Sequence, residues 1–192
     1  MSRLLYVGTH PEVQVEPQVP VPQWGLSADG YRRAEVLLTL PWVSQLAHVF
    51  SSAERKALQT AELLAVAVDR PVVVDEELRE NDRSSNGFLP PAEFEAAADL
   101  FFRAPTASAR GWETAHHAQQ RVVAAVHRCL AQASTGDVAV VAHGAVGTLL
   151  WCHLAGQPIN RQHDQPGQGS WYAVDTTTGR PLAPWQRIPA SR

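Results

Sequence analysis

Apolar and polar positions alternate along this chain in a pattern that predicts strands and helices in turn. Short apolar runs that end in a polar or glycine-containing turn predict buried strands. These runs cover residues 4–7, 49–52, 72–74, 137–142, 171–174 and 185–188. Longer segments with apolar residues three and four positions apart predict helices. These segments cover residues 27–40, 54–68, 91–102, 112–132 and 146–154.

The alternation of strands with helices predicts an α/β fold. A strand that is followed by a helix and then by another strand forms a parallel pair, with the helix packed on one face of the sheet. We therefore expect three layers, α/β/α, around a mostly parallel central sheet. Two polar segments are expected to be loops: the proline-rich stretch 11–23 and the Gly- and Pro-containing stretch 81–91.

Composition limits the kind of molecule. A length of 192 residues predicts a single domain over residues 1–192, and a hydrophobic fraction of 45% is sufficient for a core. The net charge of −3, without a basic stripe, argues against nucleic acid as a partner. A small anionic substrate needs only a few local cations and remains compatible with this charge.

Other features of the sequence point to a cytoplasmic protein without a cofactor. No apolar run reaches the ~20 residues that a membrane helix needs, and the apolar run at the N-terminus is too short for a signal peptide. Cys129 and Cys152 lie in apolar helical patterns, typical of buried thiols. The histidines form neither a His-x-His nor a His-Glu-x-x-His pair, which disfavours a metal-dependent hydrolase. The oligomeric state stays open.

Two histidines follow predicted strands directly. His10 comes after the first apolar run and precedes Pro11, which favours an extended backbone at the histidine. His143 follows the run 137–142 and precedes Gly144, at the start of a predicted helix. A helix N-terminus offers free amide N–H groups and a partial positive charge, which suit a phosphate. In an α/β sheet, ligands bind at the carboxyl ends of strands, so both histidines are candidate site residues.

A third strand-to-helix turn places Arg55 and Lys56 in the first turn of a helix. Cations at that end oppose the helix dipole, at a cost of a few tenths of a kcal/mol. This placement is reasonable if one of the two side chains faces an anion; otherwise both are solvated charges.

Short motifs occur in the order that is typical of a known family. They are Gly8-Thr9-His10-Pro11-Glu12, Leu26-Ser27-Ala28-Asp29-Gly30, Ser52 through Ala61, Leu78-Arg79-Glu80, Gly111-Trp112-Glu113-Thr114 and Val140-Val141-Ala142-His143-Gly144. In this order they resemble the histidine phosphatase, or phosphoglycerate mutase-like, superfamily. The corresponding family motifs are Arg-His-Gly-Glu, Leu-Thr/Ser-x-x-Gly, Ser-x-Leu-x-Arg-Ala-x-Gln-Thr-Ala, Leu-x-Glu, Gly-Glu-Ser and Val-x-His-Gly. The match extends over most of the chain.

The resemblance implies a phosphomonoesterase that acts on a small phosphorylated substrate through a phosphohistidine. His10 would be the nucleophile, and Glu80, or else Asp82, would protonate the leaving alkoxide. The phosphate would be stabilised by Thr9, Lys56, His143 and the N–H groups near Gly144. No metal is implied. A mutase is a less favoured alternative, because the chain is short for the family members that retain and return a phosphate.

Two residues of the predicted phosphate pocket depart from the family pattern. Thr9 stands where the family has arginine before the histidine, and Lys56 replaces the helix arginine. A threonine brings no charge, and a lysine lacks the bidentate fork of arginine. Arg55, Arg79 or Arg83 are candidates to compensate. The departures support a second hypothesis, a catalytically weakened member of the fold that binds phosphate esters or proteins.

Overall fold

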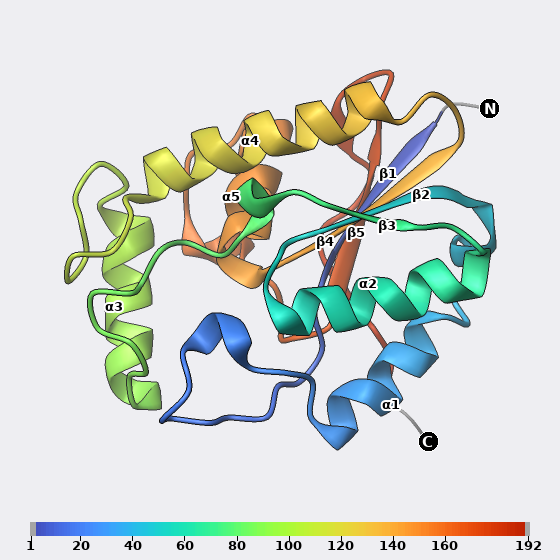
Figure 1. Cartoon of the computed structure of the whole chain (residues 1–192). Coiled ribbons are helices and arrows are strands. Elements are labelled where there is room, and N and C mark those ends of the chain that lie inside the picture. The colour runs from blue at the N-terminus through green and yellow to red at the C-terminus, as the bar shows by residue number, and fades with distance from the viewer. Residues whose placement is uncertain (1–2, 191–192) are drawn as a thin grey trace.

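A seven-stranded sheet organises residues 3–190, the part of the chain that the computed structural model describes (Figure 1). The strands are β1 (Leu4–Thr9), β2 (Leu46–Ser51), β3 (Val72–Val74), β4 (Asp137–Ala142), β5 (Ser170–Asp175), β6 (Arg180–Pro181) and β7 (Gln186–Arg187). Their order is β3-β2-β4-β1-β5-β6, and β7 also pairs with β5. The α/β class predicted from the sequence is confirmed.

The sheet is parallel from β3 through β2 and β4 to β1, and it is antiparallel at the edge formed by β5, β6 and β7. β1 pairs with β4, β4 with β2, and β2 with β3, all in parallel. β5 pairs antiparallel with β1, β6 and β7. The expected parallel arrangement therefore holds for four strands, and the antiparallel edge makes the sheet a mixed one.

Helices cover both faces of the sheet (Figure 1). They are α1 (Ala28–Leu37), α2 (Arg55–Val68), α3 (Pro91–Arg103), α4 (Ala115–Gln132) and α5 (Gly144–Ala155). Alternate residues of the strands belong to two separate hydrophobic clusters. Leu5 and Val7 pack in the cluster that includes residues of α3, α4 and α5, whereas Tyr6 packs in the cluster that includes residues of α1 and α2. Because successive side chains of a strand point to opposite faces, the sheet packs against helices on both sides, which gives three layers.

Local signals explain where several helices begin and end. The Ser27 hydroxyl accepts the amide of Gly30 at the start of α1, and the Thr114 hydroxyl accepts the amide of His117 at the start of α4. Gly156 adopts φ 66° after α5, the left-handed conformation that glycine favours. Because Thr114 is the cap, α4 begins three residues later than the predicted helix.

The chain also contains short elements that the pattern did not predict. Four 3₁₀ turns are η1 (Val21–Gln23), η2 (Val43–Gln45), η3 (Glu76–Leu78) and η4 (Arg161–His163). The strand β6 was likewise missed, since two residues carry no periodicity. The predicted terminal strand over 185–188 shortens to β7.

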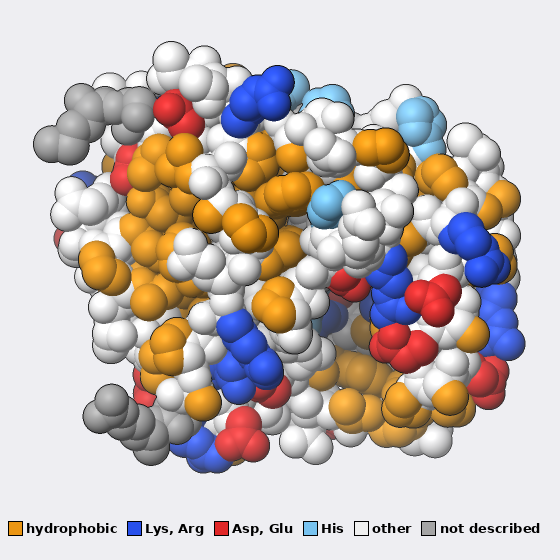
Figure 2. All heavy atoms as spheres, turned by 180° about the vertical axis from the view of Figure 1, so that it is seen from behind, with side chains coloured by type: hydrophobic (Ala, Val, Ile, Leu, Met, Phe, Trp, Pro, Cys, Tyr) orange, Lys and Arg blue, Asp and Glu red, His pale blue; other side chains and the backbone are white. Residues whose placement is uncertain are grey.

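The surface has charges of both signs. On the face shown in Figure 2, Lys and Arg side chains lie among Asp and Glu side chains, and many hydrophobic side chains gather in the left half of the view. Within residues 3–190, no helix is long and apolar enough to cross a membrane.

Cys129 and Cys152 are buried free thiols, and burial raises the pKa of Cys129 to about 12.

The sheet brings three loops to one place. β1, β2 and β4 are parallel neighbours, so their carboxyl ends lie along the same edge. His10, Ser52 and His143 are the first residues after Thr9, Ser51 and Ala142 at these ends.

Candidate active site

His10 and His143 face one another at the carboxyl edge of the sheet. Their ring centroids are 5.3 Å apart and the rings meet edge to face, at 62°. His10 is 8% exposed and His143 only 1%. The sequence predicted both residues as candidate site residues at strand ends, and the structure brings their rings together.

One ring nitrogen of His10 is fixed by the backbone. Nδ1 donates to the carbonyl oxygen of Pro11 at 2.8 Å, because a carbonyl can only accept. In the neutral ring, this places the lone pair on Nε2. Burial, and next the charge of Lys56, lower the pKa of His10 to about 4. At neutral pH the ring is therefore uncharged and able to act as a nucleophile through Nε2.

His143 is held from the other side by the turn after β2. Its Nε2 lies 2.8 Å from the Ser52 hydroxyl and 3.5 Å from Oε1 of Glu54. Burial holds the pKa of His143 well below its usual value, although the Glu54 carboxylate opposes this effect. Within the described residues, Nδ1 is buried and has no hydrogen-bond partner. A buried nitrogen without a partner, beside the ring of His10, is available to a ligand.

Glu80 lies against the start of α5. Its carboxylate accepts the amide N–H groups of Ala145, at 3.2 Å, and Val146, at 3.1 Å. These amides belong to the helix end where the sequence predicted a phosphate, so Glu80 itself occupies this anion seat. A phosphate would contact both amides only after the carboxylate has moved.

The surroundings of Glu80 favour its protonated form. Burial raises the pKa of Glu80 and Glu54 raises it further, while Arg83 and the two amides oppose the increase. Asp82, the alternative acid, is exposed, and the hydrogen bond from the Ser84 amide lowers its pKa. Of the two carboxyl groups, Glu80 is the one suited to hold and donate a proton.

A buried arginine fixes the backbone that carries Glu80. Nη1 of Arg121 donates to the carbonyls of Glu77, at 2.6 Å, and Arg79, at 3.0 Å, and Nη2 donates to that of Glu80, at 3.3 Å. Nη2 also pairs with Glu113 at 2.7 Å, and both of these side chains are almost fully buried. The pair therefore determines the path of the loop that carries Glu80.

Lys56 does not extend freely into the site. Its ammonium donates to the Glu54 carboxylate and, at 3.0 Å, to the carbonyl of Val21. The sequence analysis did not single out Glu54, although it stands where the family motif has leucine. The sequence did contain a signal for this residue, namely a charged side chain at a motif position that is apolar in the family. Burial opposes ionisation of Glu54, but His143 and Lys56 lower its pKa to about 2.

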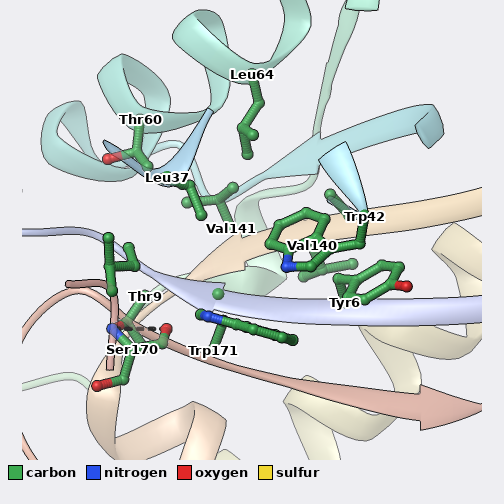
Figure 3. A pocket seen from close by; sticks show the side chains of 13 residues that line it. Tyr6, Thr9, Leu37, Trp42, Thr60, Leu64, Val140, Val141, Ser170 and Trp171 are labelled. Carbon is green, nitrogen blue, oxygen red and sulfur yellow. Dashed lines mark hydrogen bonds between the residues drawn. The ribbon is translucent and has the colours of Figure 1, made fainter. Parts of the chain in front are cut away.

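Thr9 points toward β5 and the loop before it. Its hydroxyl donates to Oε1 of Gln165 at 2.6 Å and accepts the amide of Ser170 at 3.1 Å. Figure 3 shows Thr9 and Ser170 at one end of a small internal cavity. The amide nitrogen of Gln165 lies against Gly144, 2.4 Å from the place where a Cβ would be. A side chain at position 144 would require the end of Gln165 to move, and the Thr9 hydroxyl holds that side chain through its Oε1.

The three arginines that the sequence offered as substitutes differ in position. Arg55 is exposed and reaches only the Gln23 carbonyl, and Arg79 pairs with Glu77. Arg83 lies over the rings of Phe94, at 5.1 Å, and Trp112, at 5.7 Å. Its charge lowers the pKa of both His10 and Glu80. Of the three arginines, Arg83 is therefore the one whose charge influences the pKa of His10.

Possible metal ligands do not cluster in the described part of the chain. Among residues 3–190, no group of three or more His, Cys, Asp or Glu side chains converges as metal ligands would. His117 bonds Glu113, and His116 bonds Gln120, so the neighbouring histidines of α4 have separate partners.

Comparison with known proteins places these residues in context. The sequence model of the histidine phosphatase superfamily (branch 1) matches residues 13–186, beginning just after His10. The fold is similar to Bacillus stearothermophilus YhfR, with a TM-score of 0.79, 25% identity and 95% of each chain covered. It is also similar to a mycobacterial glucosyl-3-phosphoglycerate phosphatase with inorganic phosphate, with a TM-score of 0.75, 22% identity, and 100% of this chain and 98% of that one covered.

A third similar structure is a putative alpha-ribazole-5'-P phosphatase from Escherichia coli. Its TM-score is 0.72 at 22% identity, with 100% of this chain and 98% of that chain covered. The comparison with curated proteins found no match.

Proposed function

Since the chain belongs to the histidine phosphatase superfamily, branch 1, we propose that it is a phosphomonoesterase that acts through a phosphohistidine at His10. The observation that carries this proposal is the state of the His10 ring. Its Nδ1 is bound to the Pro11 carbonyl, its ring is neutral at pH 7, and its centroid lies 5.3 Å from that of the His143 ring. An oriented neutral imidazole is the group that attacks phosphorus.

The first step is transfer of the phosphoryl group to the enzyme. Nε2 of His10 attacks phosphorus in line, and the bond between phosphorus and the ester oxygen breaks with its electron pair on that oxygen. Glu80, in the protonated form that burial favours, donates its proton to the leaving alkoxide. The alcohol leaves, and the phosphoryl group stays on His10.

The second step returns the enzyme to its first state. The Glu80 carboxylate takes a proton from water as the water oxygen attacks phosphorus. The bond between phosphorus and Nε2 breaks, and its electrons return to the ring of His10. Inorganic phosphate leaves, and Glu80 is protonated again.

Several groups are suited to stabilise the charge on the transferred phosphoryl group. His143 has its buried Nδ1 free of other partners among residues 3–190. Lys56 and Arg83 supply positive charge, and Thr9 positions Gln165 against Gly144. The amides of Ala145 and Val146 add two donors once Glu80 has turned toward the leaving group.

Replacement of His10 tests this proposal. We expect His10→Ala to hydrolyse a generic aryl phosphate at least ~10³-fold more slowly than the wild type, because the nucleophile is gone. Brief incubation of the wild type with a labelled ester should give protein-bound phosphate that is labile to acid and stable to base. The same treatment of His10→Ala should give none. Undiminished turnover by His10→Ala would refute the mechanism.

The natural substrate is to be sought among small phosphate esters. Structural neighbours are named as phosphatases of glucosyl-3-phosphoglycerate and of alpha-ribazole phosphate. These two compounds, with sugar phosphates and aryl phosphates, form a first panel. Activity that depends on His10 toward one panel member above the others would identify the substrate class.

A second function is favoured by one observation, the ion pair between Lys56 and Glu54. A lysine held by a buried carboxylate contributes less to the stabilisation of a transition state, so the protein would bind a phosphate ester without rapid hydrolysis. The measurement is calorimetric binding of inorganic phosphate alongside the aryl phosphate assay. Binding without turnover would establish this function in place of the first.

A further inference from the structure

Beside the two histidines lies a buried carboxylate that the family motif does not have. Glu54 is the residue before α2, and its side chain is 9% exposed. The motif that covers Ser52 through Ala61 has leucine at this position. An uncompensated carboxylate is costly to bury, so its partners reveal what it does.

Glu54 connects three parts of the site. One oxygen accepts from the Lys56 ammonium, and the other accepts the backbone amide of Glu80 at 2.9 Å. The second oxygen also lies 3.5 Å from Nε2 of His143. The carboxylate therefore sits where a ligand between these residues would experience its negative charge.

Lys56 is occupied as long as Glu54 is ionised. The lysine side chain is 5% exposed, and its two partners are the Glu54 carboxylate and the Val21 carbonyl. An incoming phosphate must compete with Glu54 for the ammonium, and it must also tolerate a carboxylate close by. Both effects grow with the negative charge of the ligand.

We infer that Glu54 is a specificity-determining residue, which neutralises Lys56 and lowers the affinity of the site for doubly charged phosphate. The inference rests on the proposed function only in taking a phosphoryl group as the ligand. Other charged or titratable groups around the carboxylate are His10, His143, Glu80 and Arg83. Of these groups, only Glu80 can become negative, so replacement of Glu54 by a neutral residue makes the surroundings of Lys56 more positive.

The experiment is calorimetric titration with inorganic phosphate at about pH 8, where phosphate is mainly the dianion. Glu54→Gln keeps the size of the side chain and an oxygen for the amide of Glu80. We expect it to bind phosphate at least ~10-fold more tightly than the wild type, the gain that one freed charge-assisted contact gives. In a Lys56→Met background, Glu54→Gln should produce only a small gain, because no ammonium is released.

Controls separate this effect from a general loss of negative charge or of structure. Glu12→Gln removes a carboxylate that pairs with Arg33, and it should leave the affinity for phosphate unchanged. Glu54→Leu, which restores the family residue, provides a second variant if Glu54→Gln does not fold, as judged by circular dichroism. Loss of structure alone would weaken binding, whereas the inference requires stronger binding.

Equal or weaker affinity in a folded Glu54 variant would overturn the inference, as would failure of every variant to bind phosphate. The binding measurement does not depend on turnover. If His10→Ala keeps full activity but Glu54→Gln binds phosphate more tightly, the proposed mechanism fails and the role of Glu54 stands. If His10→Ala is inactive but Glu54→Gln shows no gain, the role of Glu54 fails alone.

Discussion

The carboxylate of Glu80 accepts a hydrogen bond from the backbone amide of Val146 at 3.1 Å. Val146 lies in the first turn of α5, and His143 is the residue just before this helix. The same helix end therefore contacts the proposed acid, Glu80, and carries the second histidine. A proton on Glu80 would therefore be close to the place where the phosphoryl group would be transferred. Two predictions follow from the protonation states of these groups.

Replacement of Glu80 should affect the chemical step more than binding. In Glu80→Gln the side chain keeps its size but has no proton to give, so we expect kcat for an alkyl phosphate to fall ~10²–10⁴-fold. KM should change much less. Steady-state kinetics on the purified variant measure both values. An aryl phosphate, whose leaving group needs less protonation, should show a smaller loss.

Asp82→Asn is the matched control for Glu80→Gln. Asp82 is exposed and bonds the amide of Ser84, away from the amides of α5. Its replacement should change kcat less than ~3-fold, since it contributes at most a surface charge. A larger loss in Asp82→Asn than in Glu80→Gln would assign the acid to Asp82.

The pH dependence of kcat/KM should be bell-shaped. Burial lowers the pKa of His10 to about 4, so activity should be lost as the pH falls through that value and the nucleophile becomes charged. Burial raises the pKa of Glu80 above its ordinary value of 4.5, so activity should fall again as the pH rises through the raised value and the acid loses its proton.

Glu80→Gln identifies which group causes each limb of this profile. A substrate phosphate itself titrates near pH ~6, so wild type and variant must be compared with the same ester. The variant should keep the acid limb and lose the part of the alkaline limb that comes from Glu80. Identical alkaline limbs in both proteins would mean that Glu80 does not supply the proton.

Much of the fold was predictable because strands and helices here carry clear periodicity. The strand over 137–142 was predicted with the bounds of β4, since a run buried on both faces is uninterrupted. The antiparallel edge was not predictable. β5 joins β1 through backbone hydrogen bonds, and its direction depends on a loop, for which periodicity gives no signal.

The site was predictable only in part. The two histidines could be found because each ends a buried strand, and strand ends converge at one edge of a parallel sheet. The partners of Lys56 and Thr9 could not, because a motif gives the position of a side chain and not its direction. Gln165 lies in a loop with ordinary turn chemistry, so its contact with Gly144 emerges only from the three-dimensional arrangement.

The ion pair of Arg121 with Glu113 should contribute strongly to stability. Arg121→Ala leaves the Glu113 carboxylate buried without its cation and removes the donors to the carbonyls of Glu77 and Arg79. We expect the free energy of unfolding to fall by ~3–5 kcal/mol. Urea denaturation followed by circular dichroism measures the change.

An exposed ion pair provides the comparison for Arg121. Arg128 bonds the Asp75 carboxylate on the surface, where solvent weakens the attraction. Arg128→Ala should therefore cost only ~0–1 kcal/mol in the same denaturation experiment. If Arg121→Ala and Arg128→Ala lost similar unfolding free energy, burial would not increase the contribution of the Arg121 pair to stability.

The hydrogen bond from Thr9 to Gln165 should be measurable as an energetic coupling. Thr9→Val keeps the shape of the side chain but leaves the buried amide of Ser170 and the oxygen of Gln165 without a partner. We expect the loss in unfolding free energy to be ~1–3 kcal/mol. In the double variant Thr9→Val with Gln165→Leu, the loss in unfolding free energy should differ from the sum of the two single losses by ~0.5–3 kcal/mol. The reason is that both substitutions remove the same bond.

The control pair for this cycle joins Thr9→Val with Ser108→Ala. The Ser108 hydroxyl donates to the Trp112 carbonyl and shares no partner with Thr9. Those two losses should add to within ~0.3–0.5 kcal/mol. Additive behaviour of Thr9→Val with Gln165→Leu would mean that the threonine does not hold the glutamine against Gly144. In that case, Thr9 would be free to turn its hydroxyl toward a bound phosphate.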